Sequence, residues 1–314
     1  MAEAAAAVPS RARVYAAFAA VYVIWGSTYL AIHFALETLP PFLMAAARFL
    51  TAGGLLYAWA RLRGVLSPGR PEWRSGVVVG GLLFLGGNGA VVWAQQFVPS
   101  GVAALLIATE PILFVLLDGM RRRERPRRPV MIGLALGLLG VAVLIGPGKL
   151  LGGGRVDATA ALVLVVGSFC WAVGSLLSRR SRMPESPAMA TALTLLGGGA
   201  LLLVASLLRG ELAAFDPAAV SARSLLALIY LISFGSLVAF TAYLWILRVA
   251  TPARAATYAY VNPVVAVLLG WAFAGESLTA RMAIAATIIV GSVALIIQAG
   301  GERTKSSQAK REAA

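Results

Sequence analysis

Two prolines in this chain each follow a polar residue inside a long apolar stretch, as Glu110-Pro111 and Asn262-Pro263. A charged carboxylate at mid-membrane costs at least ~2.5 kcal/mol, so such a residue usually faces a protein interior or a cavity. Proline removes one backbone hydrogen bond and crowds the preceding turn, so Pro111 and Pro263 are predicted to break their helices. An acid beside freed carbonyls can bind an ammonium group or carry a proton.

The alternative for Glu110 is a protonated glutamate that hydrogen-bonds a neighbouring helix and only stabilises packing. Asn262 cannot titrate, so coupling to protons would involve one half of the chain. Tyr258 lies one helical turn before Asn262 and is predicted to share its face. Arg48 is a candidate to bind a substrate carboxylate or to pair with Glu110; alternatively, its side chain extends to the membrane interface.

Further candidates form matched stripes at helical spacing in four apolar segments. Small, aromatic and amide groups on one side of an apolar helix suit a ligand cavity, whereas helix–helix packing explains the small residues equally well. The candidates are Trp25, Thr28, Phe84, Asn88, Trp171, Ser236, Phe240 and Tyr243.

The elements that position these residues are predicted to be membrane helices. Of the 314 residues, 60% are hydrophobic and 13% are charged, too few charges to cover a soluble protein of this length. The apolar residues come in blocks of about 20, the length that a helix needs to cross the hydrocarbon core. We therefore expect an all-α membrane protein with ten transmembrane helices, at about 13–33, 41–61, 75–95, 100–119, 129–146, 157–178, 187–208, 224–247, 253–273 and 281–299.

The basic residues predict how these helices are oriented. With the N-terminus in the cytoplasm, the inward loops carry far more arginines than the outward loops, as the positive-inside rule requires. Both termini are then cytoplasmic, and the net charge of +14 needs no nucleic acid to explain it. The inward loops hold Arg61, Arg63, Arg70, Arg74, Arg121, Arg122, Arg123, Arg125, Arg127, Arg128, Arg179, Arg180, Arg182, Arg248 and Arg254.

The chain contains an internal repeat. At a nearly constant offset, Trp25 corresponds to Trp171, Trp93 to Trp245, and Glu110-Pro111 to Asn262-Pro263. Each half holds five spans, an odd number, so the second copy is predicted to be inverted relative to the first. Inverted repeats are typical of secondary transporters, whose substrate site lies near the midplane where the repeats meet. The alternative is a duplicated scaffold that transports nothing.

This repeat divides the chain into four parts. Residues 13–146 are predicted to form the first five-helix repeat and residues 157–299 the second, inverted one. The polar or low-complexity tails at 1–12 and 300–314 are expected to be disordered and cytoplasmic.

Three segments resemble the EamA family of the drug/metabolite transporter superfamily. They are WGSTYLAIHFALETLPPFLMAAARF at 25–49, AALLIATEPILFVLLD at 103–118, and AATYAYVNPVVAVLLGWAFAGESLT at 255–279, whose Gly275-Glu276 pair is the family's usual ending. The resemblance covers about 14–299. It implies ten helices as two inverted five-helix repeats and transport, often export, of small metabolites such as amino acids.

Motifs of enzymes are missing from the sequence. We find no phosphate-binding Walker loop, dinucleotide fingerprint, HExxH or serine–histidine–acid set, so we expect no enzyme, cofactor or metal site. The expected function is a secondary transporter of the inner membrane that exports a small molecule by alternating access. Membrane lipid and the substrate are the expected partners, with protons as a candidate coupling ion. The alternatives are a channel-like facilitator of the same fold and a membrane scaffold or sensor.

Overall fold

The computed structural model describes residues 10–97, 103, 106–145, 158–274 and 279–312, and within these ranges the regular structure is helical. Seven helical segments there are long and apolar enough to cross a membrane. Their bounds agree closely with the first, second, third, sixth, seventh, eighth and tenth predicted spans. They are Arg11–Ala35, Pro41–Leu62, Arg70–Ala94, Ala158–Ser178, Pro187–Leu208, Ala222–Val249 and Ala280–Ala299.

Two of these segments change helix type in the middle. The third predicted span consists of α3, the π-helix η1 and α4, and the eighth consists of α12, the π-helix η3 and α13. A π-helix is wider than an α-helix and is often found at functional sites. The bounds are α3 Arg70–Gly80, η1 Gly81–Gly89, α4 Ala90–Ala94, α12 Ala222–Tyr230, η3 Leu231–Phe240 and α13 Thr241–Val249.

The other long helices are uninterrupted, and two short helices lie in the loop before α12. The long helices are α1 Arg11–Ala35, α2 Pro41–Leu62, α7 Arg128–Ile145, α9 Ala158–Ser178, α10 Pro187–Leu208 and α16 Ala280–Glu312. The short ones are α11 Glu211–Ala214 and the 3₁₀ turn η2 Pro217–Ala219.

The fourth and ninth predicted spans are both interrupted, at different places. In the fourth, a turn at Ala108–Thr109 precedes α6 (Glu110–Arg122), so Pro111 occupies the first turn of a helix, where a missing N–H is tolerated. In the ninth, α14 (Pro252–Ala255) and α15 (Tyr258–Ala274) are separated by a turn at Ala256–Thr257.

The prediction that Pro263 breaks its helix is wrong. Pro263 lies inside α15, which continues without interruption to Ala274. Prolines are tolerated in membrane helices where neighbouring groups satisfy the backbone. The carbonyl that Pro263 leaves without its helical donor is that of Ala259, and the neighbouring Asn262 amide, in its hydrogen-bonded orientation, donates to the carbonyl of Tyr258 at 3.1 Å. The break lies instead at Thr257, whose hydroxyl donates to the carbonyl of Arg254 at 2.7 Å.

The prediction of a disordered tail from residue 300 also differs from the structure, because α16 continues to Glu312. The segment from Glu302 to Glu312 is rich in Glu, Lys, Arg, Gln and Ala, which have high helix propensity. Continuing a helix that has already formed avoids the cost of a new nucleus, so the helix extends past two glycines. At the other end, α1 begins at Arg11, inside the predicted tail 1–12.

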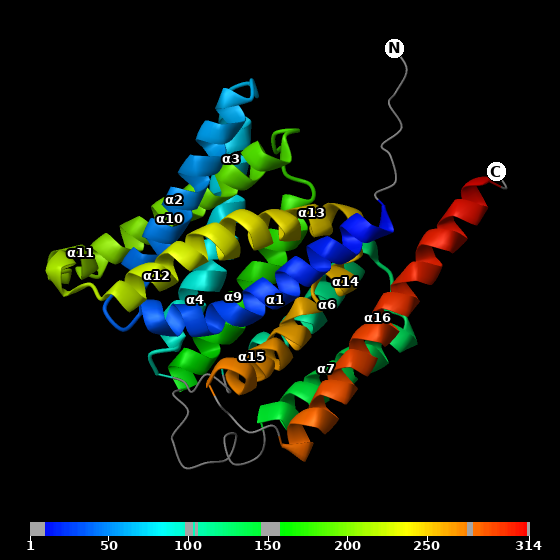
Figure 1. Ribbon diagram of the computed structural model, residues 1–314. Helices are drawn as coiled ribbons and strands as arrows, with labels where there is room; N and C mark the ends of the chain where they lie inside the picture. The colour runs from blue at the N-terminus through cyan, green and yellow to red at the C-terminus, as the bar shows by residue number, and fades with distance from the viewer. Residues whose placement is uncertain (1–9, 98–102, 104–105, 146–157, 275–278, 313–314) are drawn as a thin grey trace.

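Helices from the two halves pack in matched pairs. The helices α2 and α10 pack against each other, as do α7 and α16, which lie side by side in Figure 1. The helix α1 packs on α15 and on η3, while its counterpart α9 packs on α6 and on η1. The first helix of each half therefore packs against the interrupted span and the π-helical span of the other half.

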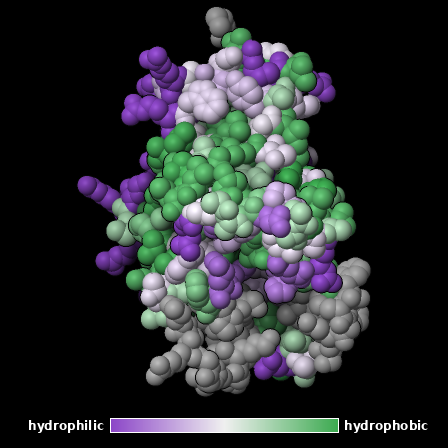
Figure 2. Space-filling view, turned by 90° about the vertical axis from the view of Figure 1, so that its left-hand side faces the viewer, coloured by the Kyte–Doolittle hydropathy of each residue, from purple (hydrophilic) through white to green (hydrophobic). Residues whose placement is uncertain are grey.

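The outer surface of these helices is apolar. Figure 2 shows a broad hydrophobic area on one face, with hydrophilic residues above it, below it and along one side. Large apolar side chains are exposed on several spans, including Leu30, Leu55, Leu136, Val166 and Leu207. In water such a surface would drive association, whereas in a bilayer it faces lipid.

Candidate functional site

One cavity of about 110 Å³ lies where the two halves meet. Ten of the twelve candidate binding residues line it, and they come from seven different predicted spans. A volume of this size is below the ~300–1,000 Å³ of typical ligand pockets, so this conformation has room only for a small molecule. The ten are Trp25, Thr28, Arg48, Phe84, Asn88, Glu110, Trp171, Phe240, Tyr258 and Asn262.

Glu110 is placed in this cavity by the interruption of its span. The Thr109 hydroxyl donates to the carbonyl of Leu106 at 2.6 Å and so satisfies one backbone group freed by the turn. Glu110 then begins α6, where the partial positive charge of a helix N-terminus favours an acidic side chain. The residue is 3% exposed, and its Oε1 accepts a hydrogen bond from the Tyr258 hydroxyl at 2.8 Å. Among the described residues, none donates to Oε2.

Arg48 lies on another wall of the same cavity and is 5% exposed. Its Nε donates to the Ser236 hydroxyl at 2.8 Å, and its guanidinium lies 4.8 Å from the centre of the Phe49 ring. Gly235 makes room for this arrangement, since a Cβ there would lie 2.7 Å from Nη2. No hydrogen-bond acceptor among the described residues contacts the two terminal nitrogens, so a planar fork of donors is available to a ligand.

The ion pair considered between Arg48 and Glu110 is not formed. Within the described part of the chain, no carboxylate oxygen lies within 4.0 Å of the Arg48 nitrogens. The cavity therefore holds a guanidinium group and a carboxyl group that are both buried and not paired with each other. A buried charge without a partner is costly, so a ligand of complementary charges would be stabilised between them.

Asn262 plays a different part from its counterpart Glu110. When the nitrogen of its side-chain amide faces α1, Asn262 donates to the carbonyls of Tyr258 and Tyr22, at 3.1 and 3.3 Å. The side chain therefore ties α15 to α1 and directs its oxygen away from those carbonyls. Its place at the cavity follows from its contact with α1, whose Gly26 lies against the Asn262 backbone.

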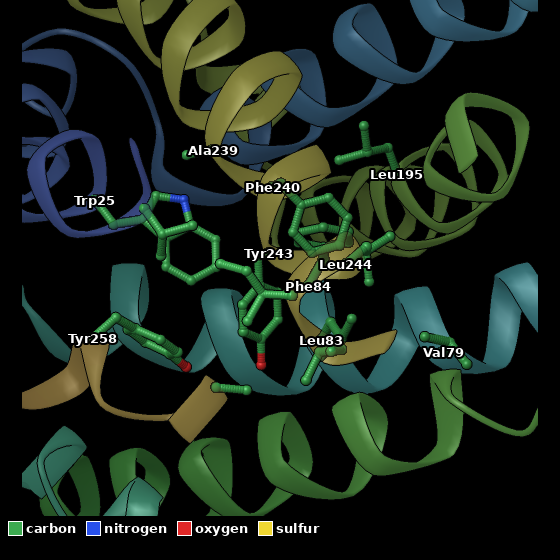
Figure 3. Close-up of a cluster of buried hydrophobic side chains, with 14 of the residues drawn as sticks. Trp25, Val79, Leu83, Phe84, Leu195, Ala239, Phe240, Tyr243, Leu244 and Tyr258 are labelled. Carbon is green, nitrogen blue, oxygen red and sulfur yellow. The ribbon is translucent and has the colours of Figure 1, made fainter. Parts of the chain in front are cut away.

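An aromatic cluster borders the cavity; it consists of Trp25, Phe84, Trp171, Phe240, Tyr243 and Tyr258. Figure 3 shows Trp25, Tyr243 and Tyr258 gathered together, and the ring of Trp25 lies 4.9 Å from each tyrosine ring. The Trp25 indole donates to the carbonyl of Gly235 at 3.2 Å. The Trp171 indole donates to the Tyr243 hydroxyl at 3.1 Å. These bonds hold the rings in fixed positions, so the cluster is a packed wall.

The two candidates that do not line the cavity support residues that do. Ser236 is fully buried and accepts the hydrogen bond from Arg48. Tyr243 is also fully buried and contacts Ser175 through a hydroxyl–hydroxyl bond of 2.7 Å. Both were placed on the cavity face by α-helical spacing. The wider turn of η3 changes which residues share a face, and Gly235 lines the cavity instead.

Asn88 has a buried polar atom without a partner. It lies in η1, and its side chain oxygen forms no hydrogen bond within the described residues. Buried acceptors are normally satisfied, so this oxygen points to a donor supplied by water or by a ligand. Thr28, in contrast, uses its hydroxyl within its own helix, where it donates to the carbonyl of Trp25 at 2.7 Å.

Several residues that line the cavity were not predicted from the sequence, although helical spacing could have identified some of them. Trp25, Thr28, Tyr29 and Ile32 follow the spacing of one helical face, so Tyr29 and Ile32 could have been found from the first two. The turn that brings Ile107 to the cavity had no comparable signal. The missed residues are Tyr29, Ile32, Phe49, Gly87, Ile107, Gly167, Ser168 and Gly235.

Pro111 and Pro263 are not among the lining residues, so they act on the site only through the backbone. Gly275 and Glu276, which carry part of the family resemblance, lie outside the described residues. In the part of the chain that the structure describes, no group of three or more His, Cys, Asp or Glu side chains could hold a metal ion.

Apolar helices around a small cavity that holds a few polar side chains define an integral membrane protein with a candidate internal site. The EamA-like transporter family matches residues 13–146 and 158–298, nearly the whole chain. The chain belongs to this family, whose name indicates a transporter and not an enzyme.

Individual relatives agree with this assignment. The inner membrane transporter YedA of Escherichia coli K12, described as uncharacterized, is 40% identical over 283 residues, which cover 90% of each chain. A probable amino-acid metabolite efflux pump of Salmonella typhimurium is 28% identical over 177 residues, 53% of each chain. One crystal structure aligns with a TM-score of 0.76 and 25% identity, over 93% of this chain and 99% of its own. These findings support an integral protein of the inner membrane.

Proposed function

We propose that the protein is a secondary transporter that exports a small zwitterionic metabolite, such as an amino acid, by alternating access between two inverted five-helix repeats. The observation that carries this proposal is a single cavity holding an arginine and a glutamate that are not paired with each other. The residues of the cavity come from both halves of the chain, as expected for a site between inverted repeats.

The packing of the two halves supports the inverted repeat. A Cβ at Gly53 would contact Leu196, and a Cβ at the corresponding Gly199 would contact Leu50 in the same way. Since Leu50 corresponds to Leu196 in the repeat, the contact is equivalent when the halves are exchanged. The π-helices η1 and η3 also fall at corresponding positions. A pseudo-twofold relation accounts for both observations.

The chemistry of the cavity supports a zwitterion. A carboxylate matches the open fork of Arg48, in which two parallel hydrogen bonds form to two oxygens. An ammonium group matches Oε2 of Glu110 together with the unpartnered oxygen of Asn88. The two groups of an amino acid carry these charges at short separation, and the aromatic cluster provides an apolar wall for its side chain. The printed name of the Salmonella relative concerns amino-acid metabolites, which agrees with this class.

The orientation rests on the distribution of arginines, which places both termini in the cytoplasm. Glu110 is then the candidate for proton coupling, since it is the carboxylate that faces the cavity. If protons are coupled through it, Glu110→Gln abolishes the pH dependence of flux. Flux that keeps the wild-type pH dependence in this variant would refute the coupling and leave transport itself untouched.

The test has two stages. Purified protein is first screened by thermal shift against amino acids, purines, sugars and cationic drugs, and we expect stabilisation by amino acids. Proteoliposomes are then loaded with the best ligand and assayed for counterflow of labelled ligand. Alternating access predicts faster uptake when unlabelled ligand is present on the trans side, whereas a channel-like facilitator shows no such stimulation. A scaffold or sensor gives flux equal to empty liposomes for every ligand.

A further inference from the structure

A second and larger cavity lies at the arginine-rich end of the helix bundle. It has a volume of about 480 Å³ and is bordered by α6, the loop that follows it, and the helices α7, α14 and α16. This cavity is separate from the one that holds Arg48 and Glu110, and it shares no lining residue with it. The proposed transport function does not use this second cavity.

The loop after α6 is folded so that its arginines face this cavity. Arg123 adopts a left-handed conformation, with φ of 55°, and ends α6. The backbone N–H of Glu124 then donates to the carbonyl of Gly119 at 3.0 Å. Gly119 permits this close return of the chain, because a Cβ there would lie 2.9 Å from the Glu124 carbonyl oxygen. The following residues Arg125 and Arg127 line the cavity as a result.

Three arginines and two carboxylates line this cavity: Arg122, Arg125, Arg127, Asp118 and Glu124. Asp118 is already neutralised by Arg122 at 2.9 Å and by Arg121 at 3.5 Å. Within the described residues, Arg125 has no carboxylate within 4.0 Å. A positive group therefore remains on the rim, next to further arginines of the same loop. A surface of this kind attracts anions, and phosphate is the anion whose geometry arginine matches best.

Apolar side chains line the same cavity. Val115, Val130 and Ile296 contribute to its lining together with the arginines, and Val115 and Ile296 are buried. The adjoining helices expose large apolar side chains outward, such as Ile132 on α7 and Val290 on α16. A ligand held here would have its anionic part at the arginines and an apolar part beside hydrocarbon. Basic pockets between membrane helices on the cytoplasmic side are suited to lipid headgroups.

We propose that this cavity binds the phosphate-bearing headgroup of an anionic phospholipid, with Arg125 as a direct contact. A phosphate alone would satisfy the arginines but leave the apolar lining unused. Setting the topology of the chain requires only that the loop be positively charged. A cavity is not needed for that purpose, so the loop would have a second function.

The experiment compares purified full-length protein in nanodiscs of phosphatidylcholine with protein in nanodiscs that also contain phosphatidylglycerol. Thermal midpoints and lipids retained in native mass spectrometry are measured for wild type, Arg125→Gln and Arg123→Gln. The two variants remove the same charge from the same loop, and only Arg125 lines the cavity. We expect Arg125→Gln to bind phosphatidylglycerol about fivefold more weakly, and Arg123→Gln to resemble wild type.

A third variant, Ala253→Leu, fills the cavity without changing charge, and we expect it also to lose the selective stabilisation. Equal effects of the two glutamine variants would overturn the proposal, because they would indicate a general surface potential. Stabilisation by inorganic phosphate in phosphatidylcholine nanodiscs, equal to that by phosphatidylglycerol, would also overturn it in favour of a soluble anion. Wild-type protein that does not distinguish the two lipids has no such site.

Discussion

The first half of the chain places charged side chains at the central cavity where the second half places neutral ones. Glu110 corresponds in the repeat to Asn262, and Arg48 corresponds to Thr194, which lies away from the cavity and donates to the carbonyl of Ala190. The second half instead contributes Tyr258 and Ser236, the partners of the two charged groups. Each charge therefore comes from one repeat and its hydrogen-bond partner from the other.

Under the inverted repeat and the zwitterionic substrate that we propose, this difference would favour one orientation of the ligand. Two identical halves would offer a zwitterion two equivalent orientations. Because the arginine and the glutamate occur once each, one orientation is favoured. If the halves exchange conformations during transport, the same two charged groups accompany the ligand in every state. The helices of the two halves would then be related by symmetry, whereas the charged side chains at the cavity would not.

The largest expected effect comes from removing the cation. Arg48→Met eliminates the open donor fork, and we expect the affinity for the amino acid selected by thermal shift to fall about 100-fold, since hydrogen bonds to charged groups contribute ~1.5–3 kcal/mol. Isothermal titration calorimetry measures this directly. The matched control is Thr194→Ala at the corresponding position, which should bind as wild type. If Thr194→Ala weakens binding as much as Arg48→Met, the asymmetry between the halves is wrong.

The next effect concerns the anion. Glu110→Gln keeps a polar group for Tyr258 but removes the charge that faces an ammonium group, so we expect roughly tenfold weaker binding of the amino acid. A carboxylic acid that lacks the amino group should bind this variant and wild type equally well. The comparison of both ligands in the same assay isolates the ammonium contact. Equal weakening for both ligands would show that Glu110 acts only through the structure of the cavity.

A third prediction moves the charge from one half to the other. Asn262→Asp replaces an amide that donates to two carbonyls by a carboxylate that faces them, so we expect the free energy of unfolding to fall by ~1–3 kcal/mol. Adding Glu110→Gln should not restore binding, because the acid would lie on the wrong repeat. Thermal unfolding in detergent and ligand titration test the two parts. A double variant that binds as wild type would mean that the halves are interchangeable.

The smallest effect is expected from the hydroxyl that supports Glu110. Tyr258→Phe removes one hydrogen bond to the carboxylate and should weaken amino-acid binding about fivefold, equivalent to ~1 kcal/mol. Tyr260→Phe is the matched control, since its hydroxyl donates to the carbonyl of Leu134 away from the cavity. Both variants should lose similar stability, and only the first should lose affinity. Equal affinities in the two variants would rule out a positioning role for Tyr258.

Part of the site was predictable because polar residues in apolar segments are rare and costly. Glu110 and Arg48 were recognisable for that reason, Asn88 was found by helical spacing with Phe84, and the repeat directed attention to Asn262. The stripe on the eighth span was less reliable. Residues Phe240, Ser236 and Tyr243 were assigned by α-helical spacing, and of these only Phe240 lines the cavity; Ser236 lies in η3, where the turn is wider, and Tyr243 lies beyond it in α13.

The interruptions show a second limit. Proline marks where a helix is weakened, but whether it ends there depends on the groups around it. Pro111 coincides with the start of α6, whereas Pro263 is accommodated inside α15 and the turn falls at Ala256–Thr257. Local sequence describes the bond that proline removes. It does not describe how the surrounding helices accommodate the proline.

The sequence by itself determined the class of protein and seven of the predicted membrane spans, and it indicated the repeat, because these depend on composition, segment length and charge, which are summed along the chain. The tertiary structure decided which polar groups meet. Only folding brought Tyr258 to Glu110 and Ser236 to Arg48, while leaving the two charged groups apart on one cavity. Such contacts join residues far apart in the chain, and their geometry depends on the packing of every helix between them.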